Sequence, residues 1–283
     1  MSMPVGRGFL RLAEGLMHVR HAGAAPDTLW LMHASPASSA SLEGLVGALG
    51  TSCQAYAPDT PGYGDSAGLG LEEPTLADYA GAQLRMMDAL GVERAVLYGH
   101  HTGAHMAVEM AIAAPERVCG LVLEGLLWLD EREREDYLRE YAPPMPPDSW
   151  GTQVFQALQW LRDQAWFFPH FRKDAEHNLG AGALPAELLH LLLIDLLKAG
   201  PGYRLAYQAV FRQRLDQRLP KIGCPVLLLQ DPGDPTSGRL EQASAQLAQC
   251  SRVQVDDAWS SAGLADKARR IHGFADVTRR TGR

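Results

Sequence analysis

The most unusual candidate for chemistry is a histidine in a turn that normally presents a nucleophile. Residues 97–105 read LYGHHTGAH and contain the frame Gly99-x-His101-x-Gly103. A short apolar run precedes the frame and a helical pattern follows it, which is typical of a sharp strand-to-helix turn that raises its middle side chain above a sheet. That middle position normally holds Ser, Cys or Asp. Here the sequence predicts a raised imidazole instead.

An imidazole in this position can act as a general base and, less commonly, as a nucleophile. Because the positive end of a helix dipole disfavours a second positive charge, we expect His101 to be neutral near pH 7. The backbone N–H of the next residue, Thr102, should point toward the same space. The turn therefore combines a base with a donor that could stabilise an oxyanion.

The elements that would position this turn alternate along the chain as strand and helix. Apolar runs predict strands at residues 29–34, 53–59, 94–99, 118–125, 224–230 and 252–258, with a hairpin over residues 10–23. Helical spacing predicts helices at residues 41–50, 75–91, 102–115, 240–249 and from Gly263 onward. Such alternation predicts βαβ crossovers and a mainly parallel sheet. Residues from about 126 to 217 break the pattern, because they are helical, punctuated by proline and rich in aromatics.

Four short motifs in this order resemble those of the α/β-hydrolase fold superfamily. They are HASP at residues 33–36, DTPGYGDS at 59–66, GHHTG at 99–103 and LLLQDPGDP at 227–235. The resemblance implies a mainly parallel central sheet flanked by helices, with a helical cap inserted after strand 6. It divides the chain into a first core part at residues 1–126, the cap at 127–217 and a second core part at 218–283.

The same resemblance assigns roles to several residues. HASP stands where the family has its oxyanion loop, so Ser35 would supply a second backbone donor beside Thr102 and His33 would hold the loop's shape by hydrogen bonds. Asp234 stands where the family usually keeps its acid. Glu124, which ends the strand LVLEG, is a second candidate acid to orient His101.

The sequence departs from the family pattern at two of the three catalytic positions. His101 replaces the nucleophile, and the loop that should carry the histidine base holds Ser260 and Ser261 instead. No histidine lies between His190 and His272, and His272 falls within the predicted last helix. An inverted pair, with His101 as the base for either serine, would require a close approach of that loop.

Two further histidine patterns point to structure rather than chemistry. His100 precedes the turn residue, and we expect it to pack beneath the edge of the sheet. His101, His105 and Glu109 fall at i, i+4 and i+8, but the helix that follows the turn should be buried, and the pattern lacks the glutamate of a HExxH zinc motif. We therefore expect no metal site. We also expect no cofactor, because the sequence contains no Gly-rich phosphate loop.

The predicted cap carries many aromatic side chains. Most should pack between cap helices, but the run WFFPHF at residues 166–171 is too apolar to lie wholly in solvent. We expect Trp128, Trp166 and Phe167 to line a pocket beneath the cap. Such a lining favours an apolar or aromatic small molecule over a sugar or a phosphate ester.

The composition of the 283 residues excludes several classes of partner. The net charge of −7 gives no electrostatic reason to bind nucleic acid or an anionic membrane. The four cysteines form no CxxC pair, and no apolar stretch is long enough to span a bilayer. The sequence thus predicts a cytoplasmic protein that acts on a small molecule.

Three hypotheses for function remain open at this point. The first is an enzyme that acts on a small, largely apolar carbonyl or ester-type compound by His-based hydrolysis or by proton transfer and elimination. The second is a catalytically retired relative that binds a small molecule, because removing triad members forfeits most of the rate. The third is a protein-interaction module with a vestigial pocket.

Overall fold

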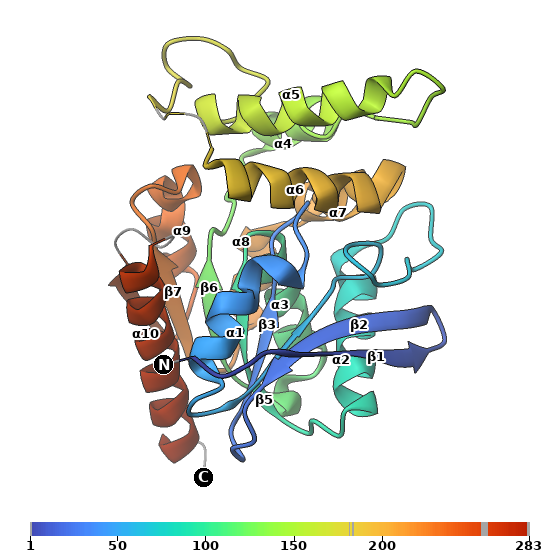
Figure 1. Ribbon diagram of the computed structural model, residues 1–283. Helices are drawn as coiled ribbons and strands as arrows, with labels where there is room; N and C mark the ends of the chain where they lie inside the picture. Colours follow the sequence, from blue (N-terminus) through green and yellow to red (C-terminus); the bar gives the residue numbers. More distant parts are fainter. Residues whose placement is uncertain (1, 181, 183, 256–259, 282–283) are drawn as a thin grey trace.

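A single twisted sheet forms the centre of the molecule in the computed structural model (Figure 1), which describes residues 2–180, 182, 184–255 and 260–281. Within these residues the sheet has eight strands in the order β1-β2-β4-β3-β5-β6-β7-β8. Only β2 runs against its neighbours, β1 and β4, and the other neighbouring pairs are parallel. The strands are β1 (Gly6–Leu12), β2 (Gly15–Ala22), β3 (Thr28–Met32), β4 (Gln54–Pro58), β5 (Ala95–His100), β6 (Val118–Glu124), β7 (Val226–Gln230) and β8 (Cys250–Gln254).

Helices cover both faces of this sheet, as the continuous apolar character of the central strands requires. The helices are α1 (Glu43–Leu49), α2 (Leu76–Ala89), α3 (Thr102–Ala113), α9 (Leu240–Ala245) and α10 (Ser261–Thr281). Side chains of α1 and α10, such as Val46 and Ile271, share one apolar core with one face of the sheet. Side chains of α2 and α3, such as Met86 and Met106, belong to a second core on the other face.

The local signals in the sequence explain several of these boundaries. The hairpin predicted at residues 10–23 is β1 and β2, which pair from Gly6 with His21 to Leu12 with Gly15. Helix α2 begins after Thr75, whose side chain and that of Asp78 each accept from the other's backbone N–H in a capping box. The end of the strand predicted at residues 252–258 lies partly outside the described residues, and β8 is observed from Cys250 to Gln254.

A layer of helices lies over the carboxyl ends of the parallel strands (Figure 1). The chain leaves the sheet after β6 and returns at β7, and between them it forms α4 (Glu131–Glu140), α5 (Thr152–Trp166), α6 (Ala186–Ala199), α7 (Arg204–Arg212) and α8 (Leu215–Arg218). We call residues 127–217 the cap. The cap is fastened to the core by hydrogen bonds, among them Ser38 N–H to Asp195 Oδ2 at 2.8 Å and Tyr63 O–H to the carbonyl of Tyr203 at 2.6 Å.

The architecture confirms the predicted fold class: an α/β-hydrolase fold with a mainly parallel sheet, flanking helices and a helical insertion after β6. Among the described residues, no helix combines the length and the apolar character needed to cross a bilayer.

Candidate active site

His101 occupies a strained backbone position between β5 and α3. Its φ is 47° and its ψ is −113°, and it is the one non-glycine residue with positive φ in the described part of the chain. Such a conformation costs about 1–3 kcal/mol and persists only where the surroundings impose it. The surroundings here include the hydrogen bond from His101 N–H to the carbonyl of Glu124 at 2.8 Å and the close approach of Gly103 to β3. A Cβ at Gly103 would lie 2.2 Å from the carbonyl oxygen of Met32.

A glycine on the neighbouring strand end makes room for the imidazole. Gly125 follows β6 with a φ of 71°, and a Cβ there would lie 2.9 Å from three atoms of the His101 ring. The ring therefore rests directly against the Gly125 backbone. Its side chain is 34% exposed and lines a cavity of about 670 Å³ between the sheet and the cap.

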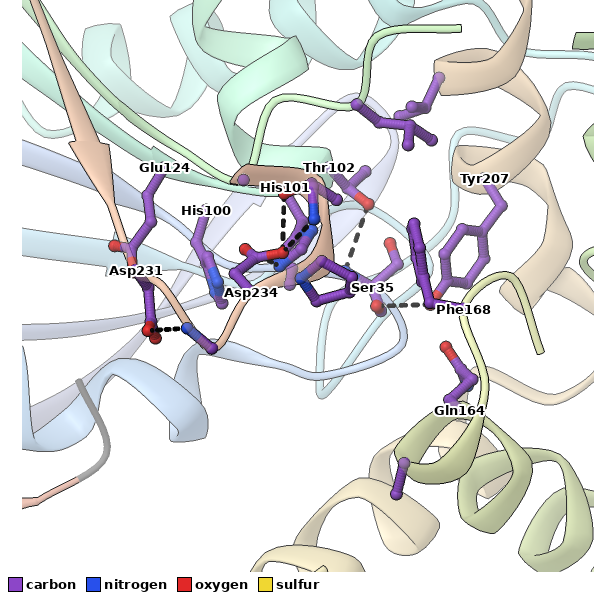
Figure 2. Close-up of a pocket in the computed structure, with 18 of the residues that line it drawn as sticks. Ser35, His100, His101, Thr102, Glu124, Gln164, Phe168, Tyr207, Asp231 and Asp234 are labelled. Atoms are coloured by element: carbon purple, nitrogen blue, oxygen red, sulfur yellow. Dashed lines mark hydrogen bonds and ion pairs between the residues drawn. The ribbon is translucent and has the colours of Figure 1, made fainter. Parts of the chain in front are cut away.

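Asp234, on the turn after β7, pairs with this imidazole (Figure 2). The distance from His101 Nε2 to Asp234 Oδ2 is 3.0 Å. The other Asp234 oxygen accepts from Thr236, from its backbone N–H at 2.8 Å and its hydroxyl at 2.7 Å, so the carboxylate is held in place. The second ring nitrogen, Nδ1, has no hydrogen-bond partner among the residues that the structure describes. The pair thus leaves one nitrogen of a cavity-lining ring available to accept a proton.

The electrostatics of the pair act on His101 in the opposite direction to the helix dipole that we expected to dominate. Burial lowers the pKa of His101, but the charge and the hydrogen bond of Asp234 outweigh it, and the pKa is raised above its ordinary value. Burial likewise raises the pKa of Asp234, yet His101 and Thr236 hold it well below its usual range. The helix dipole loses this competition because it amounts to about half an elementary charge, whereas Asp234 carries a full charge at hydrogen-bond distance.

Glu124, the second candidate acid, is committed to other partners. Its Oε2 accepts from the Tyr98 hydroxyl at 2.6 Å, and its Oε1 pairs with Lys267 Nζ at 2.7 Å. Of the two predicted acids, Asp234 is therefore the one that contacts His101. Glu124 lines the cavity, but it serves an ion pair between β6 and α10.

His100 does not pack out of reach beneath the sheet, as we expected, but lines the same cavity. Its ring centroid lies 4.4 Å from that of His101. Burial, followed by the neighbouring His101, lowers the pKa of His100 well below its ordinary value. One potential ligand atom from each of His100, His101 and Asp234 lies within 4.8 Å of the others, so among the described residues these three could hold a metal ion at the cavity.

His105 and Glu109, which follow His101 at helical spacing, are engaged in contacts of their own. His105 Nδ1 donates to Gln213 Oε1 at 2.5 Å, and its Nε2 accepts from the N–H of Leu127 at 3.1 Å. Glu109 pairs with Arg218 and accepts from the Gln213 amide. Burial lowers the pKa of His105 to about 4, so the ring is neutral. This network ties α3 to both ends of the cap.

The predicted oxyanion loop reaches the cavity, but one of its donors is engaged. Ser35 and Thr102 both line the cavity, and Ser35 N–H donates to Thr102 Oγ1 at 3.3 Å. The Ser35 carbonyl accepts from the Tyr207 hydroxyl of α7 at 2.5 Å, as Figure 2 shows. His33 is absent from the described lining. It shapes the loop by donating from Nδ1 to the Ala34 carbonyl at 3.0 Å and accepting from Thr60 N–H at Nε2.

The serines predicted in place of the base lie elsewhere. Neither Ser260 nor Ser261 is among the described residues that line the cavity. Ser260 Oγ accepts from Gly263 N–H at 3.0 Å in the first turn of α10, and Ser261 is the first, exposed residue of that helix. The rest of the predicted base loop, residues 256–259, lies outside the described part of the chain.

The aromatic lining of the cap side also differs from the prediction. Trp128, Trp166 and Phe167 do not line the cavity in the described structure, and 41% of Trp166 is exposed. The next residue, Phe168, lines it instead, because the chain becomes extended after α5 and successive side chains then face opposite sides. Sequence reasoning also missed Tyr141, Tyr207 and Phe211, although Tyr203, Tyr207 and Phe211 share one face of a helix by their spacing.

A family model described as alpha/beta hydrolase fold matches residues 27–258. The chain belongs to this family.

Several proteins of known name or structure are similar to this chain. The 2-hydroxy-6-oxononadienedioate/2-hydroxy-6-oxononatrienedioate hydrolase of Paraburkholderia phymatum is 36% identical over 114 residues, 38% of this chain and 39% of that protein. The putative carbamate hydrolase RutD of Klebsiella pneumoniae is 34% identical over 190 residues, 66% of each chain. A crystal structure of a hydrolase from Pseudomonas aeruginosa superposes with a TM-score of 0.66 at 23% identity, over 88% of this chain and 89% of the other.

These similarities differ in what they establish. The likeness to the solved structure shows the fold alone, because the identity is low. The chain spans less than half of the length of several curated relatives that it matches, 17% in one case and 39% in another.

Proposed function

We propose that this protein hydrolyses a small, largely apolar ester-type or carbonyl compound, with His101 as the general base in place of a serine nucleophile. The observation that carries the proposal is the His101–Asp234 pair at 3.0 Å on the wall of a cavity of about 670 Å³, with Nδ1 left open. A volume of this size suits a small molecule. That relatives are named as hydrolases supports hydrolysis as the reaction class.

The mechanism follows from the two ring nitrogens. Nε2–H donates to Asp234, so Nδ1 carries the lone pair and takes a proton from a water molecule that attacks the substrate carbonyl carbon. The raised pKa of His101 makes the ring a stronger base, and Asp234 stabilises the imidazolium that forms. The imidazolium then returns the proton to the leaving oxygen as the tetrahedral intermediate collapses. No acyl-enzyme forms along this route.

The oxygen that becomes negative in this step would be held by backbone donors. The N–H groups of Ser35 and Thr102 face the same part of the cavity in the family's arrangement, and Thr102 as the first residue of α3 has no intrahelical acceptor for its N–H. The substrate oxygen must take the Ser35 donor from Thr102 Oγ1, and the 3.3 Å length of that bond indicates a weak contact.

The same base could instead remove a proton from carbon and drive an elimination. The two routes differ in the fate of water, because hydrolysis places a solvent oxygen in the product and elimination does not. Reaction in ¹⁸O-labelled water, followed by mass spectrometry of the acid product, distinguishes them.

A catalytically retired, ligand-binding relative is the second candidate, and one observation favours it. The hydroxyl of Thr102 occupies the Ser35 donor that an oxyanion would use. In that case the protein binds a small molecule in the cavity but does not catalyse a reaction on it. An open cavity argues against a pure protein-interaction module with a vestigial pocket.

The test uses 4-nitrophenyl butyrate, a small apolar ester with a coloured product. We expect slow hydrolysis by the intact protein that a serine-directed fluorophosphonate does not block. His101→Ala should lose about 10²–10⁴-fold in rate, the typical contribution of a general base. Asp216→Asn, at an exposed position of α8, is the matched control and should keep the full rate. A rate that survives His101→Ala would refute the proposal, and binding without turnover would support the second candidate.

A further inference from the structure

The cavity is asymmetric in charge from one end to the other. At the strand ends it is lined by three carboxylates, those of Glu124, Asp231 and Asp234 (Figure 2). At the cap end it is lined by apolar and aromatic side chains such as Phe168, Val210 and Phe211. Within the described part of the chain, neither Lys nor Arg lines the cavity. A substrate that reaches His101 therefore meets several carboxylates, and no Lys or Arg among the described lining residues is there to neutralise a carboxylate of its own.

The three carboxylates are not equally compensated. Asp234 pairs with His101, and Glu124 pairs with Lys267, which lies behind the wall rather than on it. Asp231 accepts at Oδ1 from Gly233 N–H at 2.8 Å, and no cation pairs with it among the described residues. Burial, then Glu124 and Asp234, raises the pKa of Asp231, as expected of a carboxylate close to others of the same charge.

From this arrangement we infer that the cavity admits uncharged or ammonium-bearing substrates and excludes carboxylate-bearing ones, with Asp231 as the residue that enforces the selection. The inference rests on the site of the proposed function, but it concerns binding rather than turnover. Two unit charges about 5 Å apart repel strongly at the effective dielectric of a partly buried site, enough for a tenfold to hundredfold loss of affinity. A neutral ligand of the same shape escapes that repulsion.

The experiment compares three ligands that share one apolar tail and differ in the head group: 4-phenylbutanamide, 4-phenylbutanoate and 4-phenylbutylamine. Binding to the full chain is measured by isothermal titration calorimetry at about pH 8, where the acid and amine probes are ionised. We expect the amide and the amine to bind roughly tenfold or more tightly than the carboxylate.

Variants locate the source of the selection. Asp231→Asn keeps the shape of the side chain and the Oδ1 acceptor for Gly233. It should bind the carboxylate probe more tightly than the intact protein does, so that the difference in affinity between the amide and the carboxylate becomes several-fold smaller. Asp231→Ser provides a second neutral side chain should the first variant fold poorly. Asp216→Asn removes one negative charge from an exposed position of α8 and should leave the difference in affinity between the amide and the carboxylate unchanged.

Three results would overturn the inference. The first is equal affinity of the intact protein for the carboxylate and the amide, the second is an unchanged difference between these affinities in both Asp231 variants, and the third is no binding of any probe. None of these depends on hydrolysis. The effect of His101→Ala on ester turnover is a separate measurement, so the failure of one proposal is distinguishable from the failure of the other.

Discussion

The two walls of the cavity are built by different means. The floor consists of strand ends and the turns that follow them. Its reactive groups, His101 and Asp234, belong to the turns after β5 and β7, which lie on either side of β6 in the sheet. The roof consists of cap helices, and its lining depends on which face each helix turns inward. The floor is therefore fixed by backbone geometry, whereas the roof is fixed by packing between side chains.

This difference predicts that small changes in the floor's backbone are the most damaging. We expect Gly103→Ala to lower the free energy of unfolding by about 3 kcal/mol or more, because its Cβ would overlap the Met32 carbonyl at 2.2 Å. Gly202→Ala in the cap, where a Cβ meets nothing within 4 Å, is the matched control and should change it by less than about 0.5 kcal/mol. Urea unfolding measures both. Equal changes in the free energy of unfolding for the two variants would mean that the backbone of the floor is no more tightly constrained than that of the cap.

The next largest effect should follow from removing the charge beside His101. Asp234→Asn is expected to lower the rate of ester hydrolysis about 10²-fold, since the imidazolium loses its partner. Because the base must be unprotonated, the rate of the intact protein should rise with pH through a midpoint above the ordinary histidine value. The variant loses the interaction that raises the pKa of His101, so its midpoint should move to lower pH. If the pH midpoint of the rate is the same in Asp234→Asn as in the intact protein, Asp234 does not raise the pKa of the catalytic base.

In the roof, Phe168, which lines the cavity, should affect substrate binding more than Trp166, which does not. We expect Phe168→Ala to raise KM roughly tenfold, because it removes apolar surface that the substrate covers. Trp166→Ala should change KM less than about twofold, since Trp166 is exposed and is not among the described residues that line the cavity. Steady-state kinetics on 4-nitrophenyl butyrate give both KM values. A larger change in KM for Trp166→Ala than for Phe168→Ala would support Trp166 as the lining residue, as predicted from the sequence.

The smallest effect should come from the contact that joins the two walls. Tyr207→Phe removes the hydrogen bond to the Ser35 carbonyl, and we expect kcat to fall about fivefold while KM changes little. A change in KM alone would mean that Tyr207 contacts the substrate and does not position the oxyanion loop.

Much of the floor could be predicted from the sequence. The Gly-x-His-x-Gly frame pointed to His101, and the resemblance of LLLQDPGDP to the α/β-hydrolase motif pointed to Asp234. The charge state of His101 could not be predicted in the same way. It depends on the distance to Asp234, which is more than a hundred residues away in the chain.

The errors in the remaining assignments have physical causes. Trp166 and Phe168 differ by two positions across a helix end, and only the bounds of α5 decide which one faces inward. Glu124 had the right residue type and position for an acid, but Tyr98 and Lys267 bind it. His100 was expected to pack away from the site, and the turn at His101 brings the two rings together instead.

The central claim is that His101 donates from Nε2 to Asp234 and keeps Nδ1 as the base. Nitrogen-detected NMR of the ¹⁵N-histidine-labelled protein, titrated through neutral pH, reads the tautomer and the protonation state of that ring directly, with His101→Gln as the assignment control. The account predicts a proton on Nε2, a lone pair on Nδ1 and a pKa above the ordinary histidine value. A proton on Nδ1 in the neutral ring, or a pKa below the ordinary value, would contradict it.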